Sequence, residues 1–350
     1  MKQKFKDLIK EVDIRNTSGE DLALFGVSIT KEFIKSVANI IGTDLTKYKV
    51  VKKNQFVCSL MQVSRDEKIP IALWSNNESI IVSPAYKVFE VVDTNVVLPE
   101  YLALWFKREE FDREASYYGV GGVRGSLEWE DFCAMAAPVP SLEEQRKIVS
   151  EYEIIENRIT IKRQINDNLE ATLTAEFRKL FLSGTTSESV LLGDIIQFGN
   201  GKSRPKISGS YPVYGGNGIL DYVDTYNAEN IVAIGRVGAY CGSVYIETQK
   251  CWISDNAISA KSKLCEYEYY DYFLLKLLNL FNYHVGTGQQ LLTQEILNRI
   301  IIPKPNIDDI TRFNQVANQL FKTILANDVE IKRLIELKGI VLSRLSQLSH

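Results

Sequence analysis

The spacing of apolar residues along the chain predicts two long helices that pair with each other. In two stretches, apolar side chains recur at steps of three and four residues and keep the same phase for many turns. This repeat is typical of a coiled-coil seam rather than of one face of a globular helix. The predicted seam residues are Ile148, Tyr152, Ile155, Ile159, Leu169 and Leu173 in the first stretch and Leu320, Ile324, Asn327, Ile331, Leu334, Val341 and Leu345 in the second.

Each helix would extend on the order of 50 Å at about 1.5 Å per residue, and neither can bury its apolar stripe alone. We therefore expect the two helices to pair antiparallel, with the polar residues Asn166 and Asn327 restricting their register. The alternative is that each helix packs only on the globular part of its own repeat. The first helix begins after Pro140, where Ser141 and Glu144 have the spacing of a capping box.

Short runs of β-branched and aromatic residues, broken by Gly, Asn and Asp, fill much of the remaining chain. Examples are QFVCSL, IPIALW, SIIVSPAYKVFEVV, NIVAIG and SVYIET, which predict strands. Helical patterns such as PEYLALWFKREEF and YYDYFLLKLLNLF alternate with them. The pattern predicts an α+β fold in which two globular α/β domains, each with a curved or barrel-like sheet, are separated by the long helices.

The chain contains an internal repeat of very long period. Each copy has a Pro-x-Pro, at 138–140 and at 303–305, that follows a glycine-containing polar loop and precedes a long helix. Upstream, SIIVSPAYKVFEV pairs with KCWISDNAISAKS, and LPEYLALWFK pairs with YYDYFLLKLL. The order predicts a globular domain at 1–141, a helical spacer at 142–188, a second globular domain at 189–306 and a second helical spacer at 307–350, related by a pseudo-twofold axis. Antiparallel helices would place the globular domains at opposite ends of a rod.

Composition places the chain among ordinary soluble proteins, with 45% apolar and 24% charged residues. It has no run of about 18 apolar residues, and it opens with the charged MKQKFKDLIKEVD, so we expect it in the cytoplasm. The net charge of -3 and the pI near 5.7 argue against a protein that coats DNA nonspecifically. Basic residues are nevertheless concentrated locally. The acid-free run 195–220 holds Lys202, Arg204 and Lys206, and the stretch 31–53 includes Lys49 and Lys52.

The residues that catalysis or metal binding needs are scarce. Gly201, Lys202 and Ser203 imitate the end of a phosphate-binding P-loop, but Ile196 stands where that loop needs its first glycine. His284 is the only non-terminal histidine, and we expect it to be a loop or packing residue. The five cysteines stand far apart, so we expect reduced, mostly buried thiols. We predict a chain without catalytic residues, metal or cofactor of its own.

These segments, taken together, resemble a known family. The run PVPSLEEQRKIVSEYEIIENRITIKRQINDNLEATLTAEFRKLF resembles the central helical region of type I restriction-modification specificity subunits. Segment 191–256 resembles one of that family's target-recognition domains, through YPVYGGNGILDYVDTY, IGRVGAYCGSVY and WISDNAIS. The resemblance covers nearly the whole chain. The first copy lacks the Gly-Arg-x-Gly pattern of the second, because QFVCSLMQVSRDEKIPIAL stands where the second copy has IVAIGRVGAYCGSVYIE.

The resemblance implies that the two globular domains are target-recognition domains, each of which reads one half of a bipartite site in double-stranded DNA, while the helices fix the gap. It also implies that the helices dock methyltransferase subunits, which carry S-adenosylmethionine, and that ATP-driven restriction subunits join the complex. Magnesium and ATP would then act on the partner chains. The pseudo-twofold symmetry leads us to expect two methyltransferase subunits.

Several polar residues are candidate DNA contacts in this interpretation. Asn217 lies in Tyr-Gly-Gly-Asn-Gly, where its amide suits adenine, although Asn-Gly equally predicts an ordinary turn. Arg236, in Gly-Arg-Val-Gly, would bind guanine or phosphate unless it pairs with a nearby acid. Polar loops at equivalent repeat positions supply the glutamines and a further arginine. The predicted contacts are Lys202, Arg204, Lys206, Tyr214, Asn217, Arg236, Gln289, Gln290, Arg124, Lys49 and Lys52.

The leading hypothesis from the sequence is a non-catalytic DNA-recognition and scaffold subunit that directs a methyltransferase and a nuclease to a two-part site. One alternative is an equivalent specificity subunit of another restriction class, which genomic neighbours would distinguish. Another is a coiled-coil scaffold that does not bind DNA selectively even when its partners are supplied. An enzyme is the least favoured class.

Overall fold

The structure is a computed structural model of the 350-residue chain. It describes residues 2–36, 42–61, 63–120, 125–182, 188–264, 267–286 and 288–347. The chain divides into two compact units, Met1–Ile161 with Glu330–His350 and Lys162–Val329, and each is described by itself. The division runs through both long helices, so each unit holds part of each helix. The four-segment division expected from the sequence stays a prediction.

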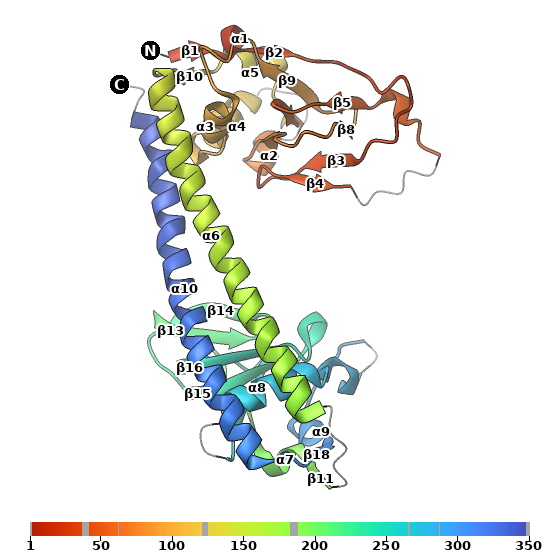
Figure 1. The fold of residues 1–350 in the computed structure, drawn as a ribbon, viewed down its shortest axis with the longest axis vertical. Coiled ribbons are helices and arrows are strands. Elements are labelled where there is room, and N and C mark those ends of the chain that lie inside the picture. Colours follow the sequence, from red (N-terminus) through yellow and green to blue (C-terminus); the bar gives the residue numbers. More distant parts are fainter. Residues whose placement is uncertain are drawn as a thin grey trace. The chain divides into compact units, whose positions relative to one another are not determined.

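The first unit is built on two four-stranded sheets, with strand orders β2-β9-β6-β7 and β4-β3-β8-β5, and on the pair β1-β10 (Figure 1). Phenylalanines from α1, β6, β9, α3 and α5 form much of its core. Its elements are β1 (Lys2–Lys4), α1 (Phe5–Leu8), β2 (Ile9–Glu11), β3 (Leu24–Val27), β4 (Phe33–Lys35), η1 (Leu45–Lys47), β5 (Lys49–Val51), β6 (Gln55–Cys58), α2 (Val63–Asp66), β7 (Ile71–Leu73), β8 (Ile80–Val82), β9 (Lys87–Val91), α3 (Pro99–Phe106), α4 (Glu109–Gly119), α5 (Trp129–Ala134) and β10 (Ala136–Pro138).

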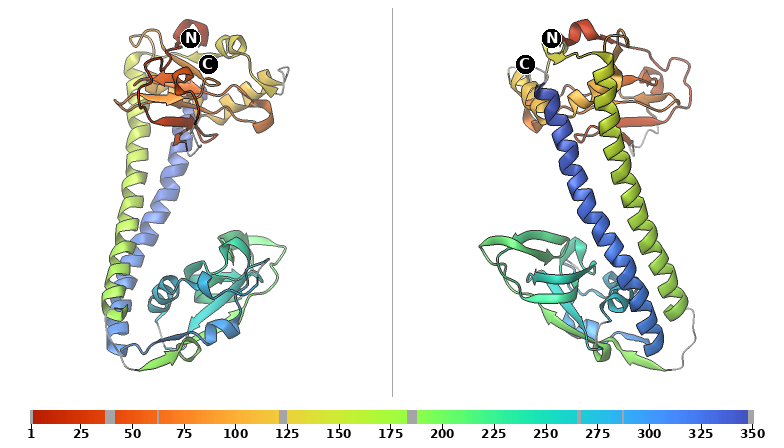
Figure 2. Two further views of the ribbon diagram at one scale, coloured as in Figure 1. Left: turned by 90° about the vertical axis from the view of Figure 1, so that its right-hand side faces the viewer. Right: turned by 60° about the vertical axis from the view of Figure 1, so that its left-hand side comes forward.

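The second unit is built on one six-stranded sheet, with strand order β12-β17-β15-β16-β13-β14, and on the pair β11-β18. The sheet is coloured green to cyan in Figure 2. The elements are β11 (Ser189–Leu191), α7 (Leu192–Ile195), β12 (Ile196–Asn200), β13 (Ser208–Gly215), β14 (Gly218–Val223), β15 (Ala228–Gly235), η4 (Gly238–Tyr240), β16 (Val244–Ile253), β17 (Ala257–Ser262), α8 (Glu268–Leu277), η5 (Leu280–Tyr283), α9 (Gln294–Asn298) and β18 (Ile301–Pro303).

The mixed α/β architecture of two repeated domains and two long helices agrees with the fold expected from the sequence. The sheets are open rather than closed barrels. In the second unit β12 and β14 form the two edges, and no pairing among the described strands joins them. Most neighbouring strands run antiparallel, and the exceptions are the parallel pairs β3–β8 and β13–β16.

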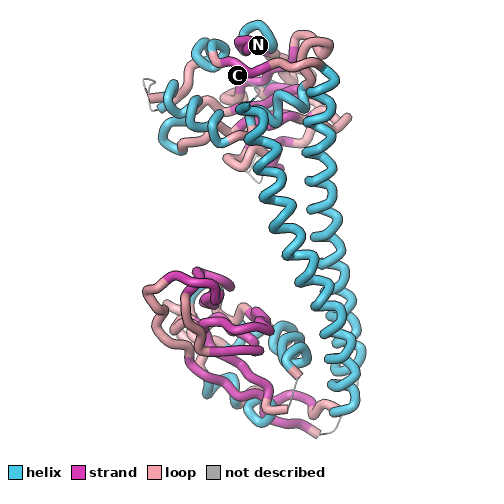
Figure 3. Tube along the Cα trace, turned by 90° about the vertical axis from the view of Figure 1, so that its left-hand side faces the viewer, coloured by secondary structure: helices cyan, strands magenta, loops and turns pink. Residues whose placement is uncertain are grey.

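The two long helices are α6 (Leu142–Phe177), which η3 (Arg178–Leu182) continues, and α10 (Ile307–Gln347). Figure 3 draws them as long cyan tubes. Within the first unit their segments run antiparallel, because Glu156 pairs with Lys338 and the preceding Glu151 pairs with the later Arg344. The helix segments of the second unit are joined by a polar layer. Lys162 Nζ donates to Asn327 Oδ1 at 2.8 Å, and Asn327 Nδ2 donates to Asn166 Oδ1 at 2.8 Å.

The predicted seam residues lie in two different environments. In the first unit a small cluster packs helix against helix and consists of Ile155, Ile159, Ile331 and Leu334. Nearer the globular part, the seam joins the domain core through Ile148, Tyr152, Val341 and Leu345. In the second unit Leu173 belongs to the core and Leu320 and Ile324 pack against it, while Leu169 is half-buried. Both arrangements expected from the sequence are therefore present, each along a different part of the helices.

Apart from the pairing of β5, both units repeat the same strand pairings in matching register, which agrees with the internal repeat. The strand β16 pairs with β15 and then with β13, and so corresponds to β7 and β8 together. The second unit has no counterpart of β5 among its described strands. The matching pairs of facing residues are Lys4–Ala136 with Leu191–Ile301, Ile9–Val91 with Ile196–Ser262, and Phe25–Val82 with Tyr214–Ile253.

A buried amide ties each globular part to the start of its following helix. Gln145, which is fully buried near the start of α6, accepts from Leu98 N at 2.8 Å and donates to the carbonyls of Val96 and Pro140. In α10, Asn314 accepts from Tyr270 N at 3.1 Å. The predicted cap of α6 is also present, since Glu144 N donates to Ser141 Oγ at 3.3 Å. These bonds satisfy polar groups that burial would otherwise leave unpaired.

The thiols of Cys58, Cys133, Cys241 and Cys251 are free, and Cys265 lies outside the described residues. In the described part of the chain, three or more metal-ligating side chains do not gather at any point. None of the helices described here combines the length and apolar character that crossing a membrane requires.

Candidate nucleic-acid interface

The tip of the β13–β14 hairpin presents Asn217 to solvent. Gly215 faces Gly218 in the strand register, so Gly216 and Asn217 form a two-residue turn. Gly218 adopts φ +79°, a conformation that glycine reaches without steric cost. The Asn-Gly pair can therefore be both an ordinary turn and a DNA contact, because the turn leaves the Asn217 amide exposed.

The loop between β15 and β16 packs directly against this tip. Ser243 Oγ donates to Gly216 O, and Gly235 N donates to Ser243 O at 2.8 Å. A Cβ on Gly235 would lie 2.2 Å from Tyr240 O and 2.8 Å from Gly216 O, so only glycine fits at this position. The glycine next to Arg236 is thus explained by close backbone packing.

Arg236 is anchored through its backbone, while its side chain has no partner in the part of the chain that the structure describes. Its N–H donates to Asn256 O at 3.0 Å, and its carbonyl accepts from Leu292 N at 2.9 Å. Its Nε atom is buried without a hydrogen bond, and within the described residues its guanidinium forms no ion pair. The alternative in which a nearby acid occupies Arg236 is therefore not observed in the described part of the chain.

The loop that carries the two predicted glutamines lies beside Arg236. Val285 and Leu291 close this loop with two backbone hydrogen bonds of 2.9 Å, and Gln290 O accepts from Gly238 N at 3.0 Å. Gln289 is exposed and Gln290 is half-buried. Three loops therefore meet at one end of the six-stranded sheet, through direct backbone hydrogen bonds or close packing. They carry Asn217, Arg236 and Gln289.

The predicted basic segment reaches the same end of the sheet. Lys202 N donates to Ile253 O at 3.0 Å, next to the residues that bind Tyr214 and Arg236. Lys202 and Lys206 are exposed, whereas Arg204 pairs with Asp221 at 3.1 Å on the surface. No helix follows Lys202 directly, since the chain enters a loop and then β13, so the segment lacks the structure of a P-loop.

The structure corrects two predicted direct contacts, because both side chains are buried. Tyr214 is 7% exposed, its hydroxyl donates to Glu247 Oε2 at 3.1 Å, and burial raises the pKa of the phenol. The Lys49 side chain is 5% exposed, and its ammonium lies 3.6 Å from Asp13. Neither side chain is placed to touch DNA, so we assign both a supporting role. His284 lies against the Phe281 ring, with centroids 4.7 Å apart, as a packing residue would.

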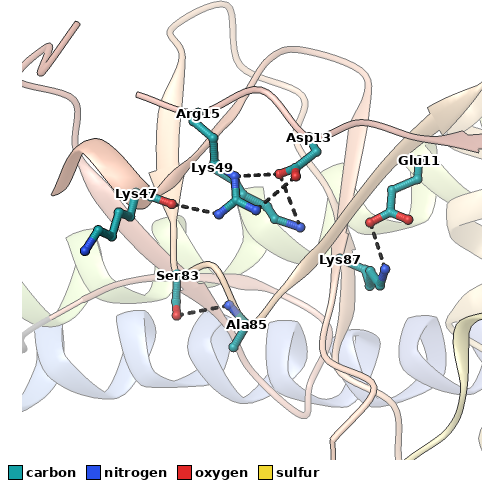
Figure 4. Close-up of polar contacts among 8 residues, drawn as sticks. All are labelled: Glu11, Asp13, Arg15, Lys47, Lys49, Ser83, Ala85 and Lys87. Carbon is teal, nitrogen blue, oxygen red and sulfur yellow. Dashed lines mark hydrogen bonds and ion pairs between the residues drawn. The ribbon is translucent and has the colours of Figure 1, made fainter. Parts of the chain in front are cut away.

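In the first unit the predicted contact Lys52 is exposed, and Arg124 lies outside the described residues. Leu60 holds the place of Arg236, because its carbonyl accepts from Leu127 N just as Arg236 O accepts from Leu292 N. The first unit therefore has no arginine at that position. Sequence reasoning overlooked Arg15, which forms a polar cluster with Asp13 and Lys49 (Figure 4). The sequence could have indicated Arg15 by its position in the repeat, because it follows the start of β2 at the same spacing as Lys202 follows the start of β12.

Comparisons with known proteins agree with this architecture. The family model of the "Type I restriction modification DNA specificity domain" matches residues 12–171 and 185–338, which are the two repeats. None of the curated proteins matches the chain. One similar solved structure is the S subunit of a type I restriction-modification system from M. genitalium, with a TM-score of 0.67, 14% identity, and coverage of 99% of this chain and 95% of that chain.

A second similar structure concerns complex assembly and conformational transition of the type I R-M system. It has a TM-score of 0.50 and 16% identity, with coverage of 99% of this chain and 97% of that chain. At such identities the likeness to solved structures shows the fold, whereas the family match rests on the sequence of both repeats. The chain belongs to the family of type I restriction-modification DNA specificity domains.

Proposed function

We propose that this chain, as the DNA specificity subunit of a type I restriction-modification system, reads one half of a bipartite target with each of its two units. The long helices set the gap between the halves and dock the partner subunits. In the second unit Asn217, Arg236, Gln289 and Gln290 read base edges, while Lys202, Arg204 and Lys206 contact phosphates.

One observation carries this proposal: the recognition loops of the second unit converge at one end of its sheet around an arginine with free bonding capacity. The Arg236 backbone is fixed by two hydrogen bonds, while its Nε has no partner among the described residues. An arginine that is anchored by its backbone and forms no ion pair among the described residues can offer its guanidinium to a paired acceptor such as guanine O6 and N7. Since the fold is duplicated, the same chain supplies a second reader.

Exposed apolar side chains on the helices support docking of partner subunits. Isolated apolar residues on a surface need no explanation, but repeated ones along a helix suit a protein interface. On the helix segments of the first unit they are Ile154, Ile161, Ile335, Leu337 and Ile340, and on those of the second unit Ile165, Val316, Leu325 and Val329. We infer that these side chains bind two methyltransferase subunits, one for each repeat, and that restriction subunits join the complex.

Catalysis in this proposal belongs to the partner chains. S-adenosylmethionine binds the methyltransferase subunits, while ATP and magnesium act with the restriction subunits. This chain contributes no catalytic residue, and its role is to position the partners on DNA. The complex acts in the cytoplasm, where its DNA target is located.

The test is to co-express the chain with the methyltransferase encoded beside it and to map the methylated bases. A bipartite motif is the expected result. Arg236→Ala and Gln289→Ala should each relax the sequence requirement in one half-site only, since both residues belong to one unit. Lys206→Ala should weaken binding to all sequences and make it less dependent on salt, with a slope reduced by about one.

Lys304→Ala is the matched control, because this exposed lysine pairs with Glu188 beside the β11–β18 pair, away from the recognition loops. It should change neither the motif nor the salt slope. Equal relaxation of both half-sites by Arg236→Ala would contradict separate readers. A complex with no sequence preference would instead favour the scaffold alternative.

A further inference from the structure

Arg15 in the first unit is held in one orientation by a carboxylate. Its Nε lies 2.8 Å from Asp13 Oδ1, and its Nη2 donates to Asp13 Oδ2 at 2.9 Å, so the pair is bidentate (Figure 4). Nη1 donates to Lys47 O at 2.8 Å. A guanidinium has five N–H groups, and the bonds to described residues leave two of them unused. Its orientation is therefore fixed while part of its bonding capacity is free.

The carboxylate is itself supported from the interior. The Lys49 ammonium lies 3.6 Å from Asp13 Oδ1, and the Lys49 side chain is 5% exposed. Lys49 belongs to β5, which pairs antiparallel with β8, and its backbone faces Arg15 in an isolated bridge. The hydrogen bond from Arg15 is the main cause that lowers the pKa of Asp13, so the carboxylate stays ionised. Lys49, Asp13 and Arg15 thus form a chain of contacts that ends at the partly exposed guanidinium.

The internal repeat places Arg15 where the second unit has a predicted DNA contact. Ile9 and Ile196 begin β2 and β12 in equivalent registers, and Arg15 and Lys202 each follow six residues later. Each residue forms an isolated bridge just beyond the strand, although the partners differ: Arg15 bridges antiparallel to Lys49 and Lys202 parallel to Ser254. The first unit also carries Leu60 at the position of Arg236, so the arginine that the second unit has there is missing.

We propose that Arg15, oriented by Asp13 and supported by Lys49, reads a guanine in the half-site of the first unit. This inference rests on the proposed function. A fixed guanidinium with two free N–H groups suits the two acceptors of guanine, O6 and N7, in the major groove. The adjacent carboxylate offsets the charge of Arg15 and repels phosphate, but it does not weaken the directional match to a neutral base edge. Base reading is therefore favoured over backbone contact.

The experiment uses the chain in complex with its methyltransferase subunits and a DNA library that varies every position of the target. The wild-type complex should prefer guanine at one position of the first unit's half-site, by roughly tenfold to a hundredfold. Arg15→Lys retains the charge but not the fork, and should abolish that preference while leaving the other half-site unchanged. Asp13→Asn should reduce it, because the amide cannot hold the guanidinium through two acceptors.

Arg15→Gln provides a second variant, since its amide suits adenine rather than guanine and should lower the guanine preference at the same position. The matched control is Arg113→Lys, an exposed arginine of the same unit that also pairs with carboxylates, on α4. It should leave the profile unchanged. Thermal unfolding of each complex checks that the variants are folded.

Two results would overturn the inference. Uniform weakening across all sequences by Arg15→Lys would make Arg15 a phosphate contact, and an unchanged profile would make it a purely structural ion pair. In either case a bipartite target would still support the proposed function. A wild-type complex without any target preference would reject the proposed function, and the inference with it.

Discussion

Asp271 lies on α8 with 2% of its surface exposed, and its Oδ2 atom has no hydrogen-bond partner among the described residues. Burial raises the pKa of this carboxyl well above 3.8, the ordinary value for aspartate. The folded chain therefore keeps the proton over a pH range in which the unfolded chain has released it. The contribution of this residue to stability is present at low pH and is lost as the pH rises above about 4.

We expect Asp271→Asn to stabilise the chain at pH 8, by about 1–3 kcal/mol, because an amide needs no proton to remain neutral in the core. At pH 4 the same change should have little effect. Thermal unfolding at the two pH values measures the difference. Asp224→Asn, at an exposed position of the same unit, is the control. An equal effect of Asp271→Asn at both pH values would show that ionisation is not the cause.

At the residue scale, the sequence did not tell which basic residues are exposed. Lys49 and Lys52 stand three residues apart in one basic stretch, yet the first is buried and the second exposed. All three residues of β5 are buried, so its sequence lacks the alternation that separates two faces. Arg15 was not among the predicted contacts, because the orientation that Asp13 gives it arises only in the fold.

At the scale of elements, the sequence predicted the long helices but not the hydrogen bonds that join them to the globular parts. A period of three and four residues located both helices, because that spacing repeats over many turns. Gln145 lies among charged residues and suggests a solvent-exposed position, yet it is fully buried. Its partners are the nearby Pro140 carbonyl and two groups that the fold brings from distant positions, Leu98 N and the Val96 carbonyl. Only tertiary contacts define such a bond.

We expect Gln145→Leu to destabilise the first unit by about 1–3 kcal/mol, because buried backbone groups lose their partner. Asn314→Leu should do the same to the second unit, where it leaves Tyr270 N unpaired. Hydrogen exchange measured peptide by peptide separates the two effects. Gln164→Leu, at an exposed position of α6, is the matched control. Loss of protection in both units from one substitution would mean that the amide clamps do not act locally.

At the scale of the whole molecule, duplication was the most predictable property. The two Pro-x-Pro motifs and the paired segments upstream located the repeat, and the strand registers agree with that alignment. Sequence did not predict that the sheets stay open, because closure depends on pairing between strands far apart in the chain. Nor did it predict β5, which has no counterpart among the described strands of the second unit.

The proposal that the helices set the gap between the half-sites predicts the result of a length change. Seven residues inserted into α6 beside Ile159 and seven into α10 beside Ile331 keep the seam in phase, since these residues pack together and seven residues complete two turns of a coiled coil. One heptad adds about 10 Å, or about three base pairs at 3.4 Å each. Methylation mapping should find both half-sites unchanged and the gap longer by about that amount.

Four residues inserted into α6 alone shift the seam out of phase and should abolish recognition. If the variant with one heptad in each helix still methylated targets with the original gap, contacts outside the helices would set that gap.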